Sequence, residues 1–420
     1  MKKILSLITT LIIILCSMTF FSCKDNDTVS KEPRGYITAI NKELFTAANN
    51  GERIILTGVN AGGWLLTEDW MCPTSLNGNL HEERGQYEYE DAFTELYGLE
   101  KSQELFNQYR ENWWGEEDFD NCLAIGINMI RLPFGWRDLQ ELDYTYRDNP
   151  FERLDYFVEN CAERGIYVIL DLHGAHGSQN GKHHSGDTRT GGDLYGNEIN
   201  MALTEELWVR VAEHYKDNKW VAGYDLLNEP EGTPGALMTK NTPHWAYYDR
   251  LYNSIRLIDS NHMIIMEGVW EINSLPDPVL FGWTNVCYEL HFYQWNNSNS
   301  LVAQQNFLMT KILLNEICNY NVPLFIGEFT FFDNQASWEY ALSLFNEKGW
   351  SWALWTYKVM GADSSWGLYC GENRTLNNSV TASDSEEVIA EKWSRLSTSE
   401  HFTPNQWLID VIMEYTFKGN

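Results

Sequence analysis

The sequence has few basic residues and lacks long apolar runs after its first residues. Lysine and arginine together number 30 against 59 aspartate and glutamate residues, so the formal net charge is −29. Because a nucleic acid partner calls for surplus positive charge, DNA and RNA are poor candidate ligands. Beyond the N-terminal segment no apolar stretch reaches the roughly 18 residues of a membrane-spanning helix. We therefore expect a soluble body whose membrane attachment, if it has one, comes from an anchor.

Cysteine is scattered, and no CxxC pair occurs in the chain. Without such spacing a zinc site is not expected, and we predict no metal. Six cysteines that follow the N-terminal segment allow about 15 disulfide pairings, so the pairing stays open. Three of them lie in apolar patterns that are typical of buried free thiols: Cys161, Cys287 and Cys318.

The N-terminal residues form a targeting segment rather than part of the fold. Two lysines precede an apolar run, and Ser17, Thr19 and the polar residues that follow favour a cleaved signal at 1–22 over a permanent span. The letters FFSC and the next residues KDND resemble a bacterial lipoprotein signal, in which Cys23 is acylated. We therefore expect residues 23–35 to be a lipidated tether. The protein would then be exported and anchored to the outer membrane, at the cell surface or in the periplasm.

Aromatic residues are abundant, with 18 Trp and 22 Tyr. Most of these rings pack in a core, but flat rings also stack on the apolar faces of sugars, so the surplus points to carbohydrate. From residue 36 to residue 420 we find no linker, which predicts one large domain.

Eight β-type runs alternate with amphipathic helical stretches, a pattern that predicts a single (β/α)8 TIM barrel of the α/β class. The expected strands are 54–60, 128–134, 167–173, 221–230, 262–268, 286–293, 323–329 and 350–357. The segments that follow the third and the eighth strands are long. As βα loops, both should wall the cleft.

Several of these runs pass from aliphatic to polar residues at their C-terminal ends, where barrel enzymes place their catalytic groups. The polar residues are Arg131, His173, Asn228, Glu229, His291 and Glu328. Glu229 in LLNEP ends the fourth strand, and Glu328 in FIGEF ends the seventh. Retaining glycoside hydrolysis needs two carboxyl groups about 5 to 5.5 Å apart, one to protonate the leaving oxygen and one to attack the sugar. Competing acids are Glu231, Glu267 and Glu289, of which Glu289 should lie deeper and be structural.

With these motifs the chain resembles glycoside hydrolase family 5, whose acid/base and nucleophile lie on strands four and seven. The segments GVNAGGWLL, ENWWGEEDF, INMIRLPFGW and LDLHGAHGSQNG look like those of its exo-β-1,3-glucanase branch. Two positions depart from that branch, Ala61 in place of Leu and His176 in place of Pro. The resemblance implies that Glu229 is the acid/base and Glu328 the nucleophile.

The same resemblance assigns the supporting residues. Asn228 should bind the sugar 2-hydroxyl, and Arg131 should orient Glu328 and lower its pKa. Tyr293 is assigned to Glu328, and His291 to the acid/base side.

Two further residues should contact the sugar. His173 should contact sugar hydroxyls, and Trp355 matches the ring on which the reacting sugar rests. The histidines at 176, 183 and 184, with Asp187, are expected to make loop hydrogen bonds and substrate contacts rather than to bind metal.

These assignments favour a retaining exo-acting β-1,3-glucosidase that acts on β-glucans as a monomer without a cofactor. An endo-β-1,4-glucanase or mannanase of the same family is the first alternative. A surface lipoprotein that binds glycans without turnover is the second. The paired carboxylates argue against that last alternative, because a binding protein does not need them.

Overall fold

The structure is a computed structural model, and its compact unit runs from Pro33 to Asn420. The residues that it describes are 33, 35–47, 51–80, 82–230, 243–361 and 364–418. The expected signal at 1–22, the acylated Cys23, most of the tether and Glu231 lie outside these residues.

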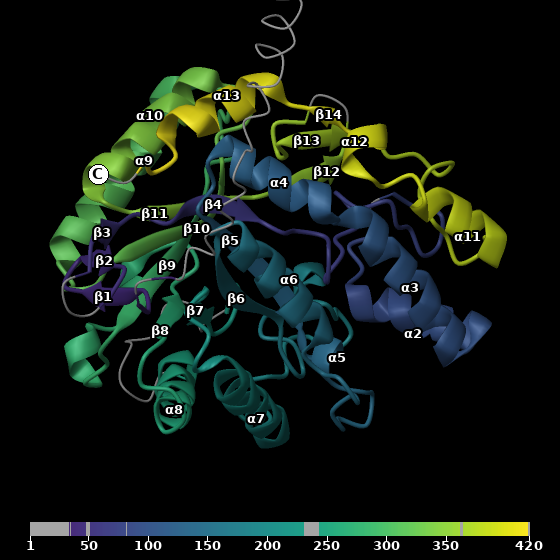
Figure 1. Cartoon of the computed structure of the whole chain (residues 1–420), viewed down its shortest axis with the longest axis horizontal. Helices are drawn as coiled ribbons and strands as arrows, with labels where there is room; N and C mark the ends of the chain where they lie inside the picture. The colour runs from purple at the N-terminus through teal and green to yellow at the C-terminus, as the bar shows by residue number, and fades with distance from the viewer. Residues whose placement is uncertain are drawn as a thin grey trace, which may run out of the picture. The chain divides into compact units, whose positions relative to one another are not determined.

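Eight parallel strands close into a barrel in the order β10-β11-β4-β5-β6-β7-β8-β9 (Figure 1). Their bounds are β4 (Thr57–Asn60), β5 (Met129–Gly135), β6 (Tyr167–Gly174), β7 (Val221–Asp225), β8 (Met263–Glu267), β9 (Val286–Tyr293), β10 (Leu324–Thr330) and β11 (Ser351–Leu354). Each of them lies within or close to a predicted run, so the predicted barrel is confirmed. Two bounds differ: β4 starts at Thr57, and β7 ends at Asp225, so Glu229 lies in the turn beyond its strand.

Helices alternate with the strands and surround the barrel in Figure 1. Those that follow barrel strands are α4 (Glu116–Ile125), α6 (Glu152–Glu163), α7 (Glu198–Tyr215), α8 (Pro243–Arg256), α9 (Leu301–Cys318) and α10 (Gln335–Lys348). Two more, α2 (Gln86–Tyr97) and α3 (Leu99–Trp113), precede α4 in the long connection from β4 to β5. None of the described helices is both long and apolar enough to cross a membrane.

An N-terminal antiparallel sheet packs against one end of the barrel. Its strands are β1 (Thr38–Ile40), β2 (Glu43–Phe45) and β3 (Arg53–Ile54). Ile37 and Leu44 share a buried cluster with Met129, Ile169 and Phe325, which lie early in their strands. Residues 53 and 54 therefore belong to this sheet, whereas the expected first barrel strand had included residue 54.

The long segment after β11 is partly ordered into a second small sheet. It consists of β12 (Lys358–Met360), β13 (Tyr369–Gly371) and β14 (Thr403–Pro404), accompanied by α11 (Glu386–Trp393), α12 (Thr398–His401) and α13 (Gln406–Tyr415). The sequence pattern predicted a loop here and did not indicate a sheet.

A glycine precedes the predicted nucleophile at a register shift in β10, between Ile326 and Glu328. A Cβ at Gly327 would lie 1.5 Å from the Glu289 Oε1 atom. Only glycine leaves room here for a buried carboxyl group from the neighbouring strand. The cysteines of the described body are free, with Cys161 and Cys287 buried and Cys318 partly so, as the apolar patterns predicted.

Candidate active site

Arg131 on β5 lies at the centre of the barrel mouth and is completely buried. Its guanidinium donates to Asn228 Oδ1 at 2.9 Å and to Asn60 Oδ1 at 3.1 Å. The carboxylates within 3.2 Å of its nitrogens are Asp171, Asp225, Glu289 and Glu328. Buried charges need such partners, because an unpaired one reduces the stability of the fold by about several kcal/mol. The cation therefore binds residues of five strands or strand ends into one network.

Glu328 on β10 is held from two sides. Arg131 Nη1 contacts its Oε1 at 3.0 Å, and the Tyr293 hydroxyl donates to its Oε2 at 2.9 Å. Arg131 lowers the pKa of Glu328, as expected, but this contribution does not decide the net shift. Burial, together with the nearby Glu229 carboxylate and against His291 and Arg131, raises the pKa of Glu328 to about 7.

Glu229 lies in the turn after β7, with a left-handed backbone conformation at φ 42°. Its backbone N–H donates to the carboxyl group of Glu267. Its Oε1 lies 3.0 Å from His291 Nδ1, and its Oε2 lies 3.3 Å from His184 Nε2. Burial raises the pKa of Glu229, and the opposing contributions that lower it come from His184 and His291 in their charged forms.

The two glutamates face each other across the mouth. One oxygen of each, together with a ring nitrogen of His291, lies within 4.8 Å of the others. This separation suits direct attack on a sugar and leaves no room for the intervening water of inverting enzymes, whose carboxyl groups are about 6.5 to 9.5 Å apart. Carboxyl groups this close titrate as a pair, which holds one proton between its two pKa values.

Three further predicted residues border the pair. Asn228 accepts from Arg131, which leaves its amide nitrogen for a ligand. His173 stacks on Trp355 with ring centroids 5.5 Å apart, and its Nδ1 lies 2.7 Å from Asp171 Oδ2. Burial and Arg131 lower the pKa of His173 to about 3, so its ring is neutral at pH 7. The predicted residues thus lie together at one site.

The competing acids lie deeper. Glu267 and Glu289 are completely or almost completely buried, and burial raises the pKa of both well above the usual range. Protonated carboxyl groups of this kind are poor nucleophiles. They serve instead as neutral neighbours beneath the mouth, as was expected for Glu289.

Sequence reasoning missed Glu68 as a site residue and gave no specific partner for His183 and His184. Glu68 accepts from Trp70 Nε1 at 2.8 Å and contacts His183 Nε2 at 3.1 Å. With His184 these residues form a wall beside Glu229. The signal for Glu68 was available, because it stands two residues after the motif GVNAGGWLL.

Two groups of side chains in the described part of the chain have the spacing that could hold a metal ion. They are Glu68 with His183 and His184, and Glu229 with His291 and Glu328. In the first group, Trp70 donates to Glu68, His183 contacts Glu68, and Asn180 donates to His184. The second group is the carboxylate pair itself. These contacts account for the donor atoms by hydrogen bonding.

An aromatic cluster extends outward from Tyr293. The rings of Trp295 and Trp366 lie 5.9 and 5.6 Å from that of Tyr293, and Trp70 contacts Trp366 at 5.1 Å. Trp295 is 62% exposed. Trp366 belongs to the segment after β11, so that segment borders the site as predicted.

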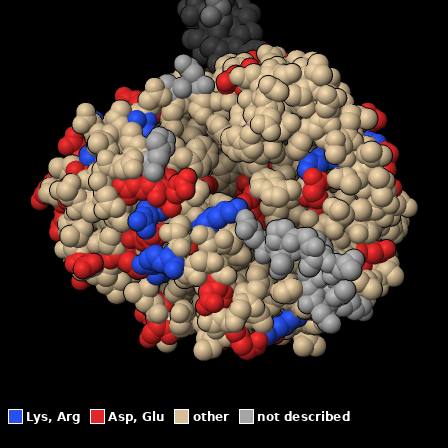
Figure 2. All heavy atoms as spheres, turned by 180° about the vertical axis from the view of Figure 1, so that it is seen from behind, with Lys and Arg blue, Asp and Glu red and all other residues tan. Residues whose placement is uncertain are grey.

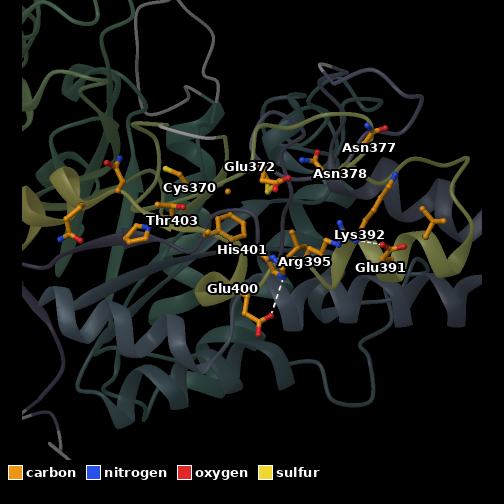
Figure 3. Close-up of a pocket in the computed structure, with 18 of the residues that line it drawn as sticks. Cys370, Glu372, Asn377, Asn378, Glu391, Lys392, Arg395, Glu400, His401 and Thr403 are labelled. Carbon is orange, nitrogen blue, oxygen red and sulfur yellow. Dashed lines mark hydrogen bonds and ion pairs between the residues drawn. The ribbon is translucent and has the colours of Figure 1, made fainter.

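A separate hollow of about 1030 Å³ lies against the small C-terminal sheet and α11 (Figure 3). Its charged groups are largely paired: Arg395 with Glu391, and His401 with Glu400. Neither Glu229 nor Glu328 lines this hollow. On the face seen in Figure 2, acidic side chains are spread among neutral ones, with no continuous basic patch that would suit a nucleic acid.

A parallel barrel with two facing carboxylates at its mouth defines the class of glycoside hydrolase barrels that use such a pair. The family model for cellulase, glycosyl hydrolase family 5, matches residues 88–361. Because this match covers well over half of the chain, the chain belongs to glycosyl hydrolase family 5.

Curated relatives agree with this family. A β-xylosidase of Phanerodontia chrysosporium is 31% identical over 251 residues, which are 58% of this chain and 49% of the relative. A glucan 1,3-β-glucosidase of Lachancea kluyveri is 30% identical over 281 residues, which are 62% of each. The chain thus spans about half to two thirds of the length of these relatives.

Solved structures share the fold at low sequence identity. Thermotoga maritima Cel5A in complex with cellobiose has a TM-score of 0.51 and 19% identity, over 71% of this chain and 90% of that one. An endogalactoceramidase has a TM-score of 0.57 and 15% identity, over 90% of this chain and 84% of that one. At such identities the likeness supports the barrel alone.

The carboxylate pair predicts a one-sided pH dependence. If turnover needs the singly protonated pair, kcat/KM on an aryl β-glucoside should fall tenfold per pH unit above about 7, where the raised pKa of Glu328 marks loss of that proton. Toward acid it should stay level until the protein unfolds, since the lower pKa is about 2. Initial rates from pH 4 to 9 test this, and activity that rises steadily through pH 8 would contradict it.

Proposed function

We propose that this protein hydrolyses β-glucosidic bonds with retention of configuration, through a covalent glycosyl-enzyme. The observation that carries the proposal is the buried Glu229 and Glu328 pair, whose oxygens lie within 4.8 Å of each other. Membership in glycosyl hydrolase family 5 and a glucosidase relative support it.

The proposed steps use the roles that the resemblance to the family gives to the two glutamates. Glu229 donates its proton to the glycosidic oxygen while Glu328 attacks the anomeric carbon, so the leaving group departs as a neutral alcohol. Glu229 then removes a proton from water, and the resulting hydroxide displaces Glu328 and regenerates both groups. Tyr293 and Arg131 keep the Glu328 oxygens in position, and both proton transfer and covalent attack come from carboxyl groups without a cofactor.

The proposed substrate is a β-1,3-glucan attacked from a chain end. The Lachancea kluyveri relative, a glucan 1,3-β-glucosidase, supports this choice. The exposed faces of Trp295 and Trp270, 62% and 43% exposed, suit stacking of sugar units beyond the cleaved bond. A β-xylosidase is the second candidate, because the relative with 31% identity carries that name.

Products separate these candidates. Purified protein incubated with laminarin should release glucose as the dominant early product, because an exo-acting site removes terminal units. Lichenan, cellulose, mannan and 4-nitrophenyl β-xyloside serve as parallel substrates, with products followed by chromatography. A ladder of oligosaccharides, or activity restricted to mannan, would favour the endo-acting alternative. A preference for the xyloside would favour the xylosidase, and binding without any turnover would favour the glycan-binding lipoprotein.

Substitution of each glutamate should produce a different lesion. Glu328→Ala removes the attacking group, so activity should vanish for every leaving group, and azide should restore it with formation of an α-glycosyl azide. Glu229→Ala should slow natural substrates by about 10²- to 10⁴-fold. It should still form the intermediate from dinitrophenyl glycosides, and azide should then yield the β-glycosyl azide. A 2-deoxy-2-fluoro glycoside adduct located by mass spectrometry on Glu267 or Glu289 would overturn the assignment.

We also propose that the protein is exported as a monomer and held at the outer membrane by a lipid on Cys23. The residues FFSC and the polar segment after them support this proposal. The variant Cys23→Ala should leave the membrane fraction with unchanged specific activity, because its catalytic barrel is untouched. Immunoblots of soluble and membrane fractions test it, and a variant that stays with the membrane would show another means of attachment.

A further inference from the structure

His184 is a histidine beside the acid/base whose role the reaction steps above do not use. It lies in a short helix, η1 (His183–Ser185), within the long loop after β6. Its Nε2 atom lies 3.3 Å from Glu229 Oε2 and 2.8 Å from Asn180 Nδ2. Whether Nε2 carries a hydrogen therefore determines whether Glu229 faces a hydrogen-bond donor or an acceptor.

Asn180 settles where the hydrogen is. Its Oδ1 accepts the backbone N–H of Lys182 at 2.9 Å, and its Nδ2 donates to the backbone carbonyl of Glu229 at 3.1 Å. Neither contact would survive a flip of the amide, because two acceptors or two donors would then face each other. The atom that faces His184 Nε2 is therefore an N–H donor, so Nε2 must be an unprotonated acceptor.

An unprotonated Nε2 interacts differently with the carboxylate and the carboxylic acid forms of Glu229. Ionised Glu229 would place a carboxylate oxygen against a nitrogen lone pair, which is repulsive. Protonated Glu229 instead has one donor and one acceptor. Its Oε2–H can share the Nε2 lone pair of His184 with Asn180, while its Oε1 lies 3.0 Å from His291 Nδ1. The environment of Oε2 thus suits the acid form of Glu229 better than the carboxylate.

We propose that His184, held as the Nδ1–H tautomer by Asn180, is a positioning residue that keeps the proton of the carboxylate pair on Glu229. This inference rests on the proposed function and adds a regulator of its acid. After Glu229 has given its proton to the leaving oxygen, the same lone pair opposes the carboxylate. Glu229 is then a stronger base toward the water of the second step.

Other charged and titratable groups near Glu229 also affect its proton affinity. Lys182 lies nearby on the same loop, Glu267 accepts from its backbone, and Glu328 repels its charge. His173, 6.3 Å from the ring of His184, and Glu68 are more distant neighbours. Burial lowers the pKa of His184, so its ring is neutral at neutral pH and does not act as a cation there. Arg131 and Tyr293 donate to Glu328 and not to Glu229, which favours the carboxylate form of Glu328.

The tautomer of His184 can be measured in the intact wild-type protein. Long-range ¹⁵N–¹H NMR spectra at pH 7, assigned with a His184→Gln sample, should show Nδ1 protonated and Nε2 bare. An Nε2–H tautomer or an imidazolium at pH 7 would overturn the inference. This measurement needs no turnover, so it remains decisive even if the proposed activity fails on every substrate.

Two variants then test the effect on catalysis. His184→Gln keeps an oxygen acceptor for Asn180, so the basic limb of kcat/KM should stay within about 0.3 pH units of the wild type. His184→Lys replaces the lone pair by a cation and should shift that limb to lower pH by about 1 to 3 units. At pH 8 the shift in His184→Lys corresponds to a loss of at least about tenfold in kcat/KM on phenyl β-glucoside.

The matched control is His183→Lys, which places the same charge one residue earlier, against Glu68 rather than Glu229. Its basic limb should move less than that of His184→Lys, even if KM changes. A dinitrophenyl glucoside, whose departure needs no proton, should show no loss from His184→Lys in the glycosylation step. Equal shifts in both lysine variants, or an unshifted limb in His184→Lys, would show that His184 does not hold the proton. An inactive wild type would instead refute the proposed function.

Discussion

The buried cation of Arg131 is the constraint on which the barrel mouth depends. Removing a guanidinium from water is expensive unless several partners replace the water, and here four carboxyl groups and two amide oxygens do so. These partners come from different strands, so the cation imposes a shared geometry on strand ends far apart in the sequence. Glu328 is one of the partners, and the reactive group is therefore positioned by the same network that satisfies the interior charge.

Charge alone cannot explain how two close carboxylates divide their work. Both are buried, both contact His291, and repulsion between them favours retention of one proton by the pair. The asymmetry comes from hydrogen-bond polarity. Arg131 and Tyr293 donate to Glu328, whereas Glu229 Oε2 faces the nitrogen acceptor of His184. A neutral His184 does not stabilise the carboxylate form of Glu229. The proton of the pair is therefore more favourable on Glu229 than on Glu328.

The sequence predicted the barrel because its strands are buried on both faces and read as short apolar runs. The ends of those runs also located Glu229 and Glu328, since a polar residue after an aliphatic run needs a special reason. Other features left no such signal. The sheet β1–β3 contains strands of two or three residues, too short for a period to emerge. Arg131 lowers the pKa of Glu328 as expected, but the net rise could not be predicted from the sequence because burial and Glu229 outweigh that effect. The contact of His184 with Glu229 joins residues 45 positions apart through a loop, and loop conformation is not encoded in a repeating pattern.

The interior of the barrel is apolar at one end and polar at the other. This arrangement explains how the function can vary while the fold is retained. At the end covered by β1–β3, side chains such as Met129, Ile169 and Phe325 pack in an apolar cluster. One layer higher, Arg131 and the buried acids form a polar floor that tolerates little change, because a substitution there leaves a buried charge or polar group without its partner. Above it, residues such as Glu68, His184 and Trp366 come from long loops. Those loops can alter the sugar that fits and the proton affinity of Glu229 without disturbing the floor that positions Glu328.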